Sequence, residues 1–210
     1  MKLKDWYNLE LVEDLAKRFD AAFVKFPRRR FVELASDGLE SLEMMDRVRL
    51  IASAMESTFP QPTSVALRGL QECMGPALDE IGNDAASVTS GYALWPFGEY
   101  LGRTGLDDWE SSWSAMDQLT QRLTSEFAVR PFLAADLSRC LDLFRSRLDH
   151  PSHQVRRWIS EGTRTRLPWA KAVPELRRAV WERLELLEQL KDDPSLYVRR
   201  SVANHLQDIL

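Results

Sequence analysis

The protein has 210 residues, with 28 lysines and arginines against 32 aspartates and glutamates and a formal net charge of −4. Its hydrophobic fraction of 44% excludes a disordered chain, and its length can bury the core of one domain or of two small ones. No apolar run approaches the roughly 18 residues of a membrane-spanning helix, and the first residues do not resemble a signal peptide. Two cysteines, Cys73 and Cys140, cannot build a disulfide framework, so we expect a protein of the reducing cytoplasm.

Amphipathic helices explain the apolar pattern along the chain. Apolar residues recur at spacings of three and four, whereas the alternation typical of strands is nearly absent. The pattern predicts helices over about 9–19, 42–55, 109–123 and 176–187, with short turns between them. Aromatic residues within these stripes, such as Trp113 and Trp181, are expected in the core.

A repeated segment predicts the architecture. Residues 149–157 (DHPSHQVRR) recur as residues 192–200 (DDPSLYVRR), at an offset of 43 residues that falls in the range of about 40–47 for HEAT and armadillo repeats. The Asp-x-Pro-Ser sequence favours a turn that opens a helix, the valine begins its buried stripe, and the arginine pair is expected to point away from the core. We therefore predict an all-α fold, a right-handed α-solenoid of HEAT-like repeats with a concave binding face. The predicted organisation is a single domain over 1–210, with an N-terminal helical cap region over 1–60 and repeats over 61–210.

Positive charge gathers in one segment of this acidic chain. Residues 150–178 hold seven lysines and arginines but only two acids, Glu161 and Glu175. One interpretation is an anionic partner held at this place. The other is a solvated helix face whose charges are balanced in three dimensions.

Glu161 departs from the pattern of a stable helix end. Gly162 is expected to end a helix that starts near Ser152, and a carboxylate in the last turn opposes the helix dipole at a cost of about 0.3–1 kcal/mol. Arg157, four residues earlier, can offset this cost through an ion pair of about 0.2–0.5 kcal/mol. The residue 43 positions later is Asn204, so the repeat does not require an acid there. The position therefore favours a functional role.

Two further residues are candidates for chemistry. Glu126 precedes Arg130 by four residues, and on spacing alone a structural ion pair between them is favoured. Trp169 lies in a basic, proline-containing loop, where an aromatic ring serves either as a lid on the core or as a platform for a sugar or base. The histidines and cysteines show no metal-ligand spacing, and no phosphate-binding loop or serine elbow occurs, so no metal and no cofactor are expected.

Three ordered segments resemble the AlkC branch of the AlkC/AlkD-type DNA alkylation repair glycosylases. They are residues 126–132 (EFAVRPF), 150–169 (HPSHQVRRWISEGTRTRLPW) and 197–204 (YVRRSVAN), and the resemblance runs from about residue 109 to the end. It implies a HEAT-like solenoid that acts as a monofunctional DNA glycosylase in base excision repair. The implied substrates are cationic alkylated bases, with 3-methyladenine as the core expectation and 1-methyladenine and 3-methylcytosine as further ones. The family does not swing the damaged base into a pocket, unlike most base-processing enzymes.

The resemblance also implies roles for particular residues and a partner. Glu126 and Glu161 would be the catalytic carboxylates and Trp169 an active-site aromatic. Six arginines would contact DNA phosphates: Arg156, Arg157, Arg164, Arg166, Arg199 and Arg200. The expected partner is alkylated double-stranded DNA bound by a monomer, with no membrane and no metal, in the bacterial cytoplasm and at the nucleoid when DNA is bound.

Two other functions fit the repeat and the basic segment. One is a non-catalytic HEAT-like scaffold or DNA-structure-binding protein, and the other is a protein-binding helical module that uses the acidic N-terminal half. The glycosylase requires Glu126, Glu161 and Trp169 to face one groove beside the arginines. Glu126 held against Arg130 on the convex surface would instead favour the scaffold.

Overall fold

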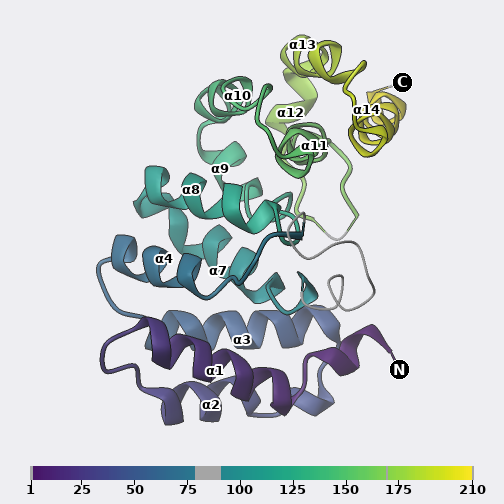
Figure 1. Ribbon diagram of the computed structural model, residues 1–210. Helices are drawn as coiled ribbons and strands as arrows, with labels where there is room; N and C mark the ends of the chain where they lie inside the picture. Colours follow the sequence, from purple (N-terminus) through teal and green to yellow (C-terminus); the bar gives the residue numbers. More distant parts are fainter. Residues whose placement is uncertain (1, 79–90, 169, 210) are drawn as a thin grey trace. The chain divides into compact units, whose positions relative to one another are not determined.

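The computed structural model describes residues 2–78, 91–168 and 170–209. Within these ranges every element of regular secondary structure is a helix (Figure 1). The prediction of an all-α chain is confirmed. The chain divides into two compact units, Met1–Leu123 and Thr124–Leu210. A single repeat domain over 1–210 stays a prediction.

The first unit is built around a cluster of phenylalanine rings. Its helices are α1 (Leu9–Ala22), α2 (Arg28–Ser36), α3 (Met44–Thr58), α4 (Thr63–Glu72), α7 (Trp95–Thr104) and α8 (Trp109–Thr120), with short 3₁₀ helices η1 (Leu3–Trp6), η2 (Leu39–Ser41) and η3 (Gly105–Asp107). Asn8 and Asp108 begin α1 and α8 by accepting a hydrogen bond from a backbone N–H three residues later. Phe19 of α1 is buried and its ring contacts Phe31 and Phe59 edge to face.

The second unit places two sequence-distant helices side by side. Its helices are α9 (Arg130–Ala135), α10 (Leu137–Arg145), α11 (His153–Gly162), α12 (Glu175–Arg178), α13 (Val180–Leu190) and α14 (Leu196–Ile209). The two copies of the repeated segment open α11 and α14, and these two helices pack against each other (Figure 1). A residue in the first copy therefore lies close to residues roughly one repeat later in the chain.

The repeated segment is a turn that closes on itself. Nη1 of Arg156 donates to the carbonyl oxygens of residues 150 and 151 at 2.6 and 3.0 Å. Nη1 of Arg199 makes the same two contacts to residues 193 and 194, at 2.6 and 3.0 Å. The side chains of His150 and Asp193 each accept from the backbone N–H two residues later. The first arginine of each pair thus folds back onto its own turn.

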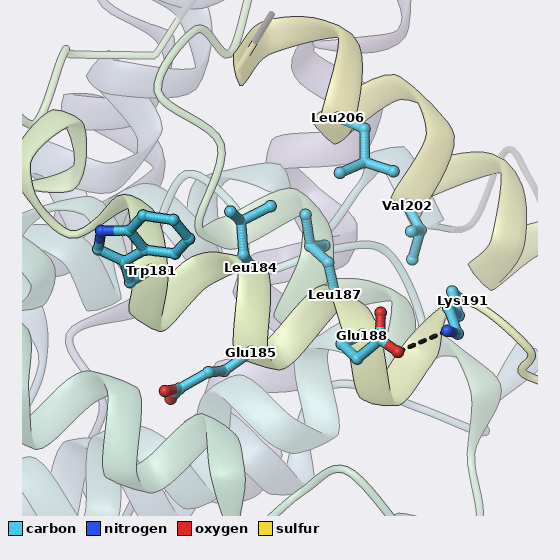
Figure 2. A pocket seen from close by; sticks show the side chains of 8 residues that line it. All are labelled: Trp181, Leu184, Glu185, Leu187, Glu188, Lys191, Val202 and Leu206. Carbon is cyan, nitrogen blue, oxygen red and sulfur yellow. Dashed lines mark hydrogen bonds and ion pairs between the residues drawn. The ribbon is translucent and has the colours of Figure 1, made fainter.

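The predicted helix over 176–187 is broken, and one of its aromatic residues is not in the core. This segment forms two helices, α12 and α13, which are separated at Ala179. Trp113 is 2% exposed, as expected, but Trp181 is 76% exposed. Trp181 lines an open groove together with Leu184 and Leu187 of α13 and Val202 and Leu206 of α14 (Figure 2). The periodicity indicated an apolar stripe, but it could not show that only part of the stripe would be covered.

Candidate active site

The second unit brings Glu126 and Glu161 together around one arginine. Glu126 lies in the turn before α9, and Glu161 lies in the last turn of α11. The two residues are only 9% and 4% exposed. Nη1 of Arg157 lies 3.4 Å from Oε2 of Glu126, and Nη2 of Arg157 lies 3.7 Å from Oε1 of Glu161. One guanidinium group therefore offsets part of the repulsion between two buried carboxylates.

A second arginine extends this arrangement to the end of α14. Nη1 of Arg164 donates to Oε2 of Glu161 at 3.0 Å. On its other side, Nε and Nη2 of Arg164 contact the two carboxylate oxygens of Asp208 at 2.7 and 3.3 Å. The ion pairs form a linear series, Glu126–Arg157–Glu161–Arg164–Asp208, which we call the carboxylate–arginine chain. It has three acids and two bases, so it carries one excess negative charge when all five groups are ionised.

The surroundings of Glu126 disfavour its charged form. Burial raises the pKa of the Glu126 carboxyl, Arg157 opposes this effect, and the negative charge of Glu161 raises the pKa further. The hydroxyl of Thr124 donates to Oε2 of Glu126 at 3.0 Å and partly offsets the rise in pKa. In the described part of the chain, the other oxygen, Oε1, makes no hydrogen bond or ion pair.

The expected ion pair between Arg157 and Glu161 is present. The prediction of an ion pair between Glu126 and Arg130 is wrong, because Arg130 has other partners. Arg130 is buried and donates to the carbonyl oxygens of Gly162, Arg164 and Lys171, at 3.3, 2.8 and 3.1 Å. These contacts tie the segment that follows α11 to the start of α9. Burial lowers the pKa of Arg130 to about 10. The guanidinium group thus donates hydrogen bonds to backbone carbonyls more than 30 residues away in the chain, and spacing rules for neighbours on one helix cannot indicate such contacts.

The six predicted phosphate-binding arginines fall into three groups. Arg157 and Arg164 belong to the carboxylate–arginine chain. Arg156 and Arg199 hold their turns, and Arg156 also pairs with Asp193 through contacts of 2.6 and 3.0 Å. Arg166 and Arg200 are exposed and form no ion pair within the described residues.

Trp169 lies outside the described residues, so its predicted role stays a prediction. A different aromatic residue, Tyr197 at the start of α14, contacts the site. The guanidinium carbon of Arg157 lies 4.7 Å from the centre of the Tyr197 ring, a cation–π distance. Tyr197 is 45% exposed, so the ring that contacts Arg157 is also open to solvent.

Gly162 has a packing role at the end of α11. A Cβ atom at this position would lie 3.2 Å from Cζ of Phe144 and 3.3 Å from Nε1 of Trp158. The helix includes Gly162, and Thr163 follows as its C-terminal cap. The absence of a side chain therefore lets the last turn, which carries Glu161, approach α10 closely.

The site offers protein groups but no metal-binding cluster. Among residues 2–78, 91–168 and 170–209, no three histidine, cysteine, aspartate or glutamate side chains are grouped so that they could hold a metal ion. No helix in the same ranges is long and apolar enough to span a membrane. The described side chains at this site are carboxylates, guanidinium groups, hydroxyl groups and an aromatic ring.

The same fold is present in a solved glycosylase structure. Pseudomonas fluorescens alkylpurine DNA glycosylase AlkC, bound to DNA containing an abasic site analog, superposes with a TM-score of 0.86 and 31% sequence identity. The chain is thus similar to AlkC along its whole length. The match covers 100% of this chain and 55% of AlkC, and it confirms the predicted HEAT-like α-solenoid and the resemblance to the AlkC branch.

Sequence comparison gives a second relative, and the chain again matches about half of its length. The uncharacterized protein YhaZ of Bacillus subtilis (strain 168) is 36% identical over 208 residues, which are 99% of this chain and 55% of YhaZ. No family model matches the chain. The chain thus spans about half the length of both relatives.

Sequence reasoning missed Asp208 and Ser201 of α14, although the repeat offset contained a signal for them. Ser201 donates to Glu161 across a separation of 40 residues, and Arg164 pairs with Asp208 across 44 residues. Both separations are close to the offset of 43 residues between the repeated segments. Polar residues about one repeat away from a candidate acid were therefore the positions to inspect.

Proposed function

We propose that this chain is a DNA glycosylase that hydrolyses the N-glycosidic bond of cationic alkylated bases in DNA. The core substrate is 3-methyladenine, with 1-methyladenine and 3-methylcytosine as further candidates. Glu126 and Glu161 are the catalytic carboxylates, and the damaged base is not drawn into a protein pocket. The partner is alkylated double-stranded DNA, and the resemblance to AlkC supports this assignment.

One observation carries the proposal: two buried carboxylates from separate elements share a single guanidinium group. Glu126 and Glu161 both contact Arg157, within a series of charges that has one acid in excess. Packing alone gives no reason to bury an unbalanced acid, because a buried charge without full compensation is costly. A site of this kind is suited to a ligand that becomes positively charged.

The chemistry of alkylated bases creates that positive charge on the sugar. Alkylation at a ring nitrogen makes the base cationic, so it leaves as a neutral molecule and needs little help from an acid. The deoxyribose then develops oxocarbenium character and must be attacked by water. Paired carboxylates solve the same problem in glycoside hydrolases.

The surroundings of the two acids support a division of work between them. Glu161 accepts from Ser201 and Arg164 and is fixed in place, which suits electrostatic stabilisation of the sugar cation. Glu126 has a raised pKa and an oxygen without a hydrogen-bond partner among the described residues, which suits the binding of the attacking water and acceptance of its proton. No covalent intermediate is required, so the proposed enzyme is monofunctional.

The exposed arginines supply the contacts to DNA in this scheme. Arg166 and Arg200 have no ion-pair partner in the described residues and present their charge to solvent. Each phosphate that they neutralise would release counterions, so binding should weaken steeply as salt concentration rises. A binding constant that does not change with salt would argue against this role.

The decisive experiment is mass spectrometry of free bases released from methylated DNA. We expect the wild-type chain to release 3-methyladenine and the double variant Glu126→Gln/Glu161→Gln to fall to the spontaneous rate. Glu185→Gln, which removes an exposed acid of α13, is the matched control and should retain release. Binding of each protein to the same DNA should be measured in parallel.

Two outcomes would contradict the proposal. Undiminished release by the double variant would remove both acids from the mechanism. A wild-type chain that binds DNA tightly but releases no base would instead be the non-catalytic DNA-binding protein.

A further inference from the structure

The two buried carboxylates are held very differently, and helix α14 makes the difference. Oε1 of Glu161 accepts from the hydroxyl of Ser201 at 2.9 Å, and Ser201 is itself buried. Oε2 of Glu161 accepts from Arg164, whose far side is held by Asp208. Glu126, in contrast, accepts from Thr124 in its own turn and from Arg157 at 3.4 Å. Both hydrogen bonds that Glu161 accepts thus depend on a residue of α14, in addition to its ion pair with Arg157.

Asp208 has a second effect, because it competes with Glu161 for the charge of Arg164. Arg164 makes two contacts with Asp208, at 2.7 and 3.3 Å, but only one hydrogen bond with Glu161, at 3.0 Å. The side chains of Arg164 and Asp208 are 16% and 15% exposed, so solvent screens this pair only in part. If Asp208 were neutral, the positive charge of Arg164 would act mainly on Glu161 and cancel its negative field.

We propose that Asp208 is a positioning residue that keeps the negative charge of Glu161 available to a cationic sugar. It does so by holding Arg164 from the side opposite Glu161. Asp208 itself touches neither Glu126 nor Glu161, and it acts through Arg164. This inference rests on the proposed function, since the cationic sugar is the species that the site would stabilise.

The inference predicts that the preference of the site for positive charge depends on Asp208. The probe is a pair of DNA duplexes, each with one abasic position. In one, the sugar is replaced by a pyrrolidine ring whose nitrogen is protonated at neutral pH. In the other, it is replaced by a neutral tetrahydrofuran ring. The ratio of the two affinities measures the field at the site and cancels the contribution of the phosphates.

We expect the wild-type chain to prefer the cationic duplex, and Asp208→Asn to reduce this preference roughly tenfold. Asp208→Glu, which keeps the charge, should restore most of it. Glu185→Gln removes a unit of negative charge from the exposed face of α13 and should leave the preference unchanged. Arg164→Gln should increase the preference, because it removes a positive charge from beside Glu161.

Opposite signs for Asp208→Asn and Arg164→Gln are a signature that a loss of folding would not produce. Far-ultraviolet circular dichroism would check that each variant is folded. In single-turnover release of 3-methyladenine, Asp208→Asn should lower the rate of the chemical step by roughly tenfold while binding of the methylated DNA changes little.

The experiment separates this inference from the proposed function. A preference for the cation that is unchanged in Asp208→Asn would overturn the role of Asp208, whether or not bases are released. A wild-type chain without any preference for the cation would overturn it as well. A preference that is present and lost in Asp208→Asn, in a protein that releases no base, would support the role of Asp208 and refute the glycosylase.

Discussion

The two copies of the repeated segment share one set of contacts and differ in another. In residues 149–162 and in residues 192–205, the first arginine of the pair holds its own turn by two carbonyl contacts of the same lengths. The second arginine, however, has different surroundings in the two copies. Arg157 lies between two buried acids, whereas its counterpart Arg200 is exposed.

The ends of the two segments differ as well. Glu161 and Gly162 in the first copy correspond to Asn204 and His205 in the second. The shared positions build a turn and a helix start, which every repeat needs. Among the positions that differ, Glu161 is a buried acid, whereas its counterpart Asn204 is exposed. A departure from the repeat is therefore a better guide to the site than the repeat itself, and each prediction below compares one pair of matched positions.

The largest effect is expected from the pair of Glu161 and Asn204. Glu161→Gln keeps the size of the side chain but removes the negative charge that would face the sugar cation. We expect release of 3-methyladenine to fall by roughly 10²–10³-fold, the magnitude for loss of one preorganised electrostatic group, with DNA binding retained. Asn204→Asp, which adds an acid at the exposed counterpart, should leave the rate unchanged. Equal effects of both variants would show that the position in the repeat has no bearing on the chemistry.

The next effect concerns the two arginines that hold the turns. Arg156→Ala leaves Asp193, whose side chain is 4% exposed, without its ion-pair partner, so we expect a loss of about 3 kcal/mol in the free energy of unfolding. Arg199→Ala removes hydrogen bonds to two carbonyls only and should cost about 1 kcal/mol. Urea denaturation of both variants gives the comparison. A smaller loss for Arg156→Ala than for Arg199→Ala would contradict the structural role of the Arg156–Asp193 pair.

His205 in the second copy makes the free energy of unfolding depend on pH. Its counterpart in the first copy, Gly162, has no side chain that could do so. Burial, reinforced by the guanidinium of Arg183, lowers the pKa of His205 to about 3 from an ordinary value of 6.5, while Asp208 opposes the shift and Arg164 adds to it. Nη1 of Arg183 lies 3.0 Å from Nε2 of His205, an arrangement that requires a neutral ring. The unfolded chain takes up a proton below pH 6.5, but the folded chain does not until about pH 3. The free energy of unfolding should therefore fall as the pH drops from 6.5 towards 3, by about 1 kcal/mol for each pH unit well below 6.5.

The measurement compares wild type with His205→Gln, whose amide oxygen can still accept from Arg183. Urea denaturation at pH 7, 6 and 5 should show a weaker dependence on pH in the variant. Glu126, whose pKa is raised, has the opposite effect on the pH dependence of stability. Above the ordinary pKa of a glutamate, the stability that its protonated form contributes is lost as the pH rises. Because Glu126 is present in both proteins, its effect cancels in the difference. Parallel curves for the two proteins would refute the assignment of a neutral His205.

The sequence predicted where helices form better than it predicted which helix faces are buried and what they contact. Periodicity and the repeat predicted the helices and their class and singled out Glu161 as a candidate, because these patterns depend on residues close in the chain. The exposure of Trp181 and the partner of Arg130 depend on which elements meet in space. The repeat offset pointed to the neighbourhood of Asp208, but not to its contact with Arg164, which depends on the packing of α11 against α14. Contacts between consecutive repeats therefore set the limit of what the pattern alone could indicate.

The smallest effect is expected at Arg200, the exposed counterpart of Arg157. Arg200→Ala removes no ion pair among the described residues, so the free energy of unfolding should change by less than about 0.5 kcal/mol. If Arg200 contacts a phosphate, the slope of log Kobs for DNA against log salt concentration should become less negative by about 1. Arg30→Ala, at an exposed arginine of α2 in the other unit, is the matched control, and we expect its slope to equal that of wild type. A slope unaffected by Arg200→Ala would remove this residue from the DNA contacts, and the exposed arginine of the second copy would then be a solvated counterpart of a functional one.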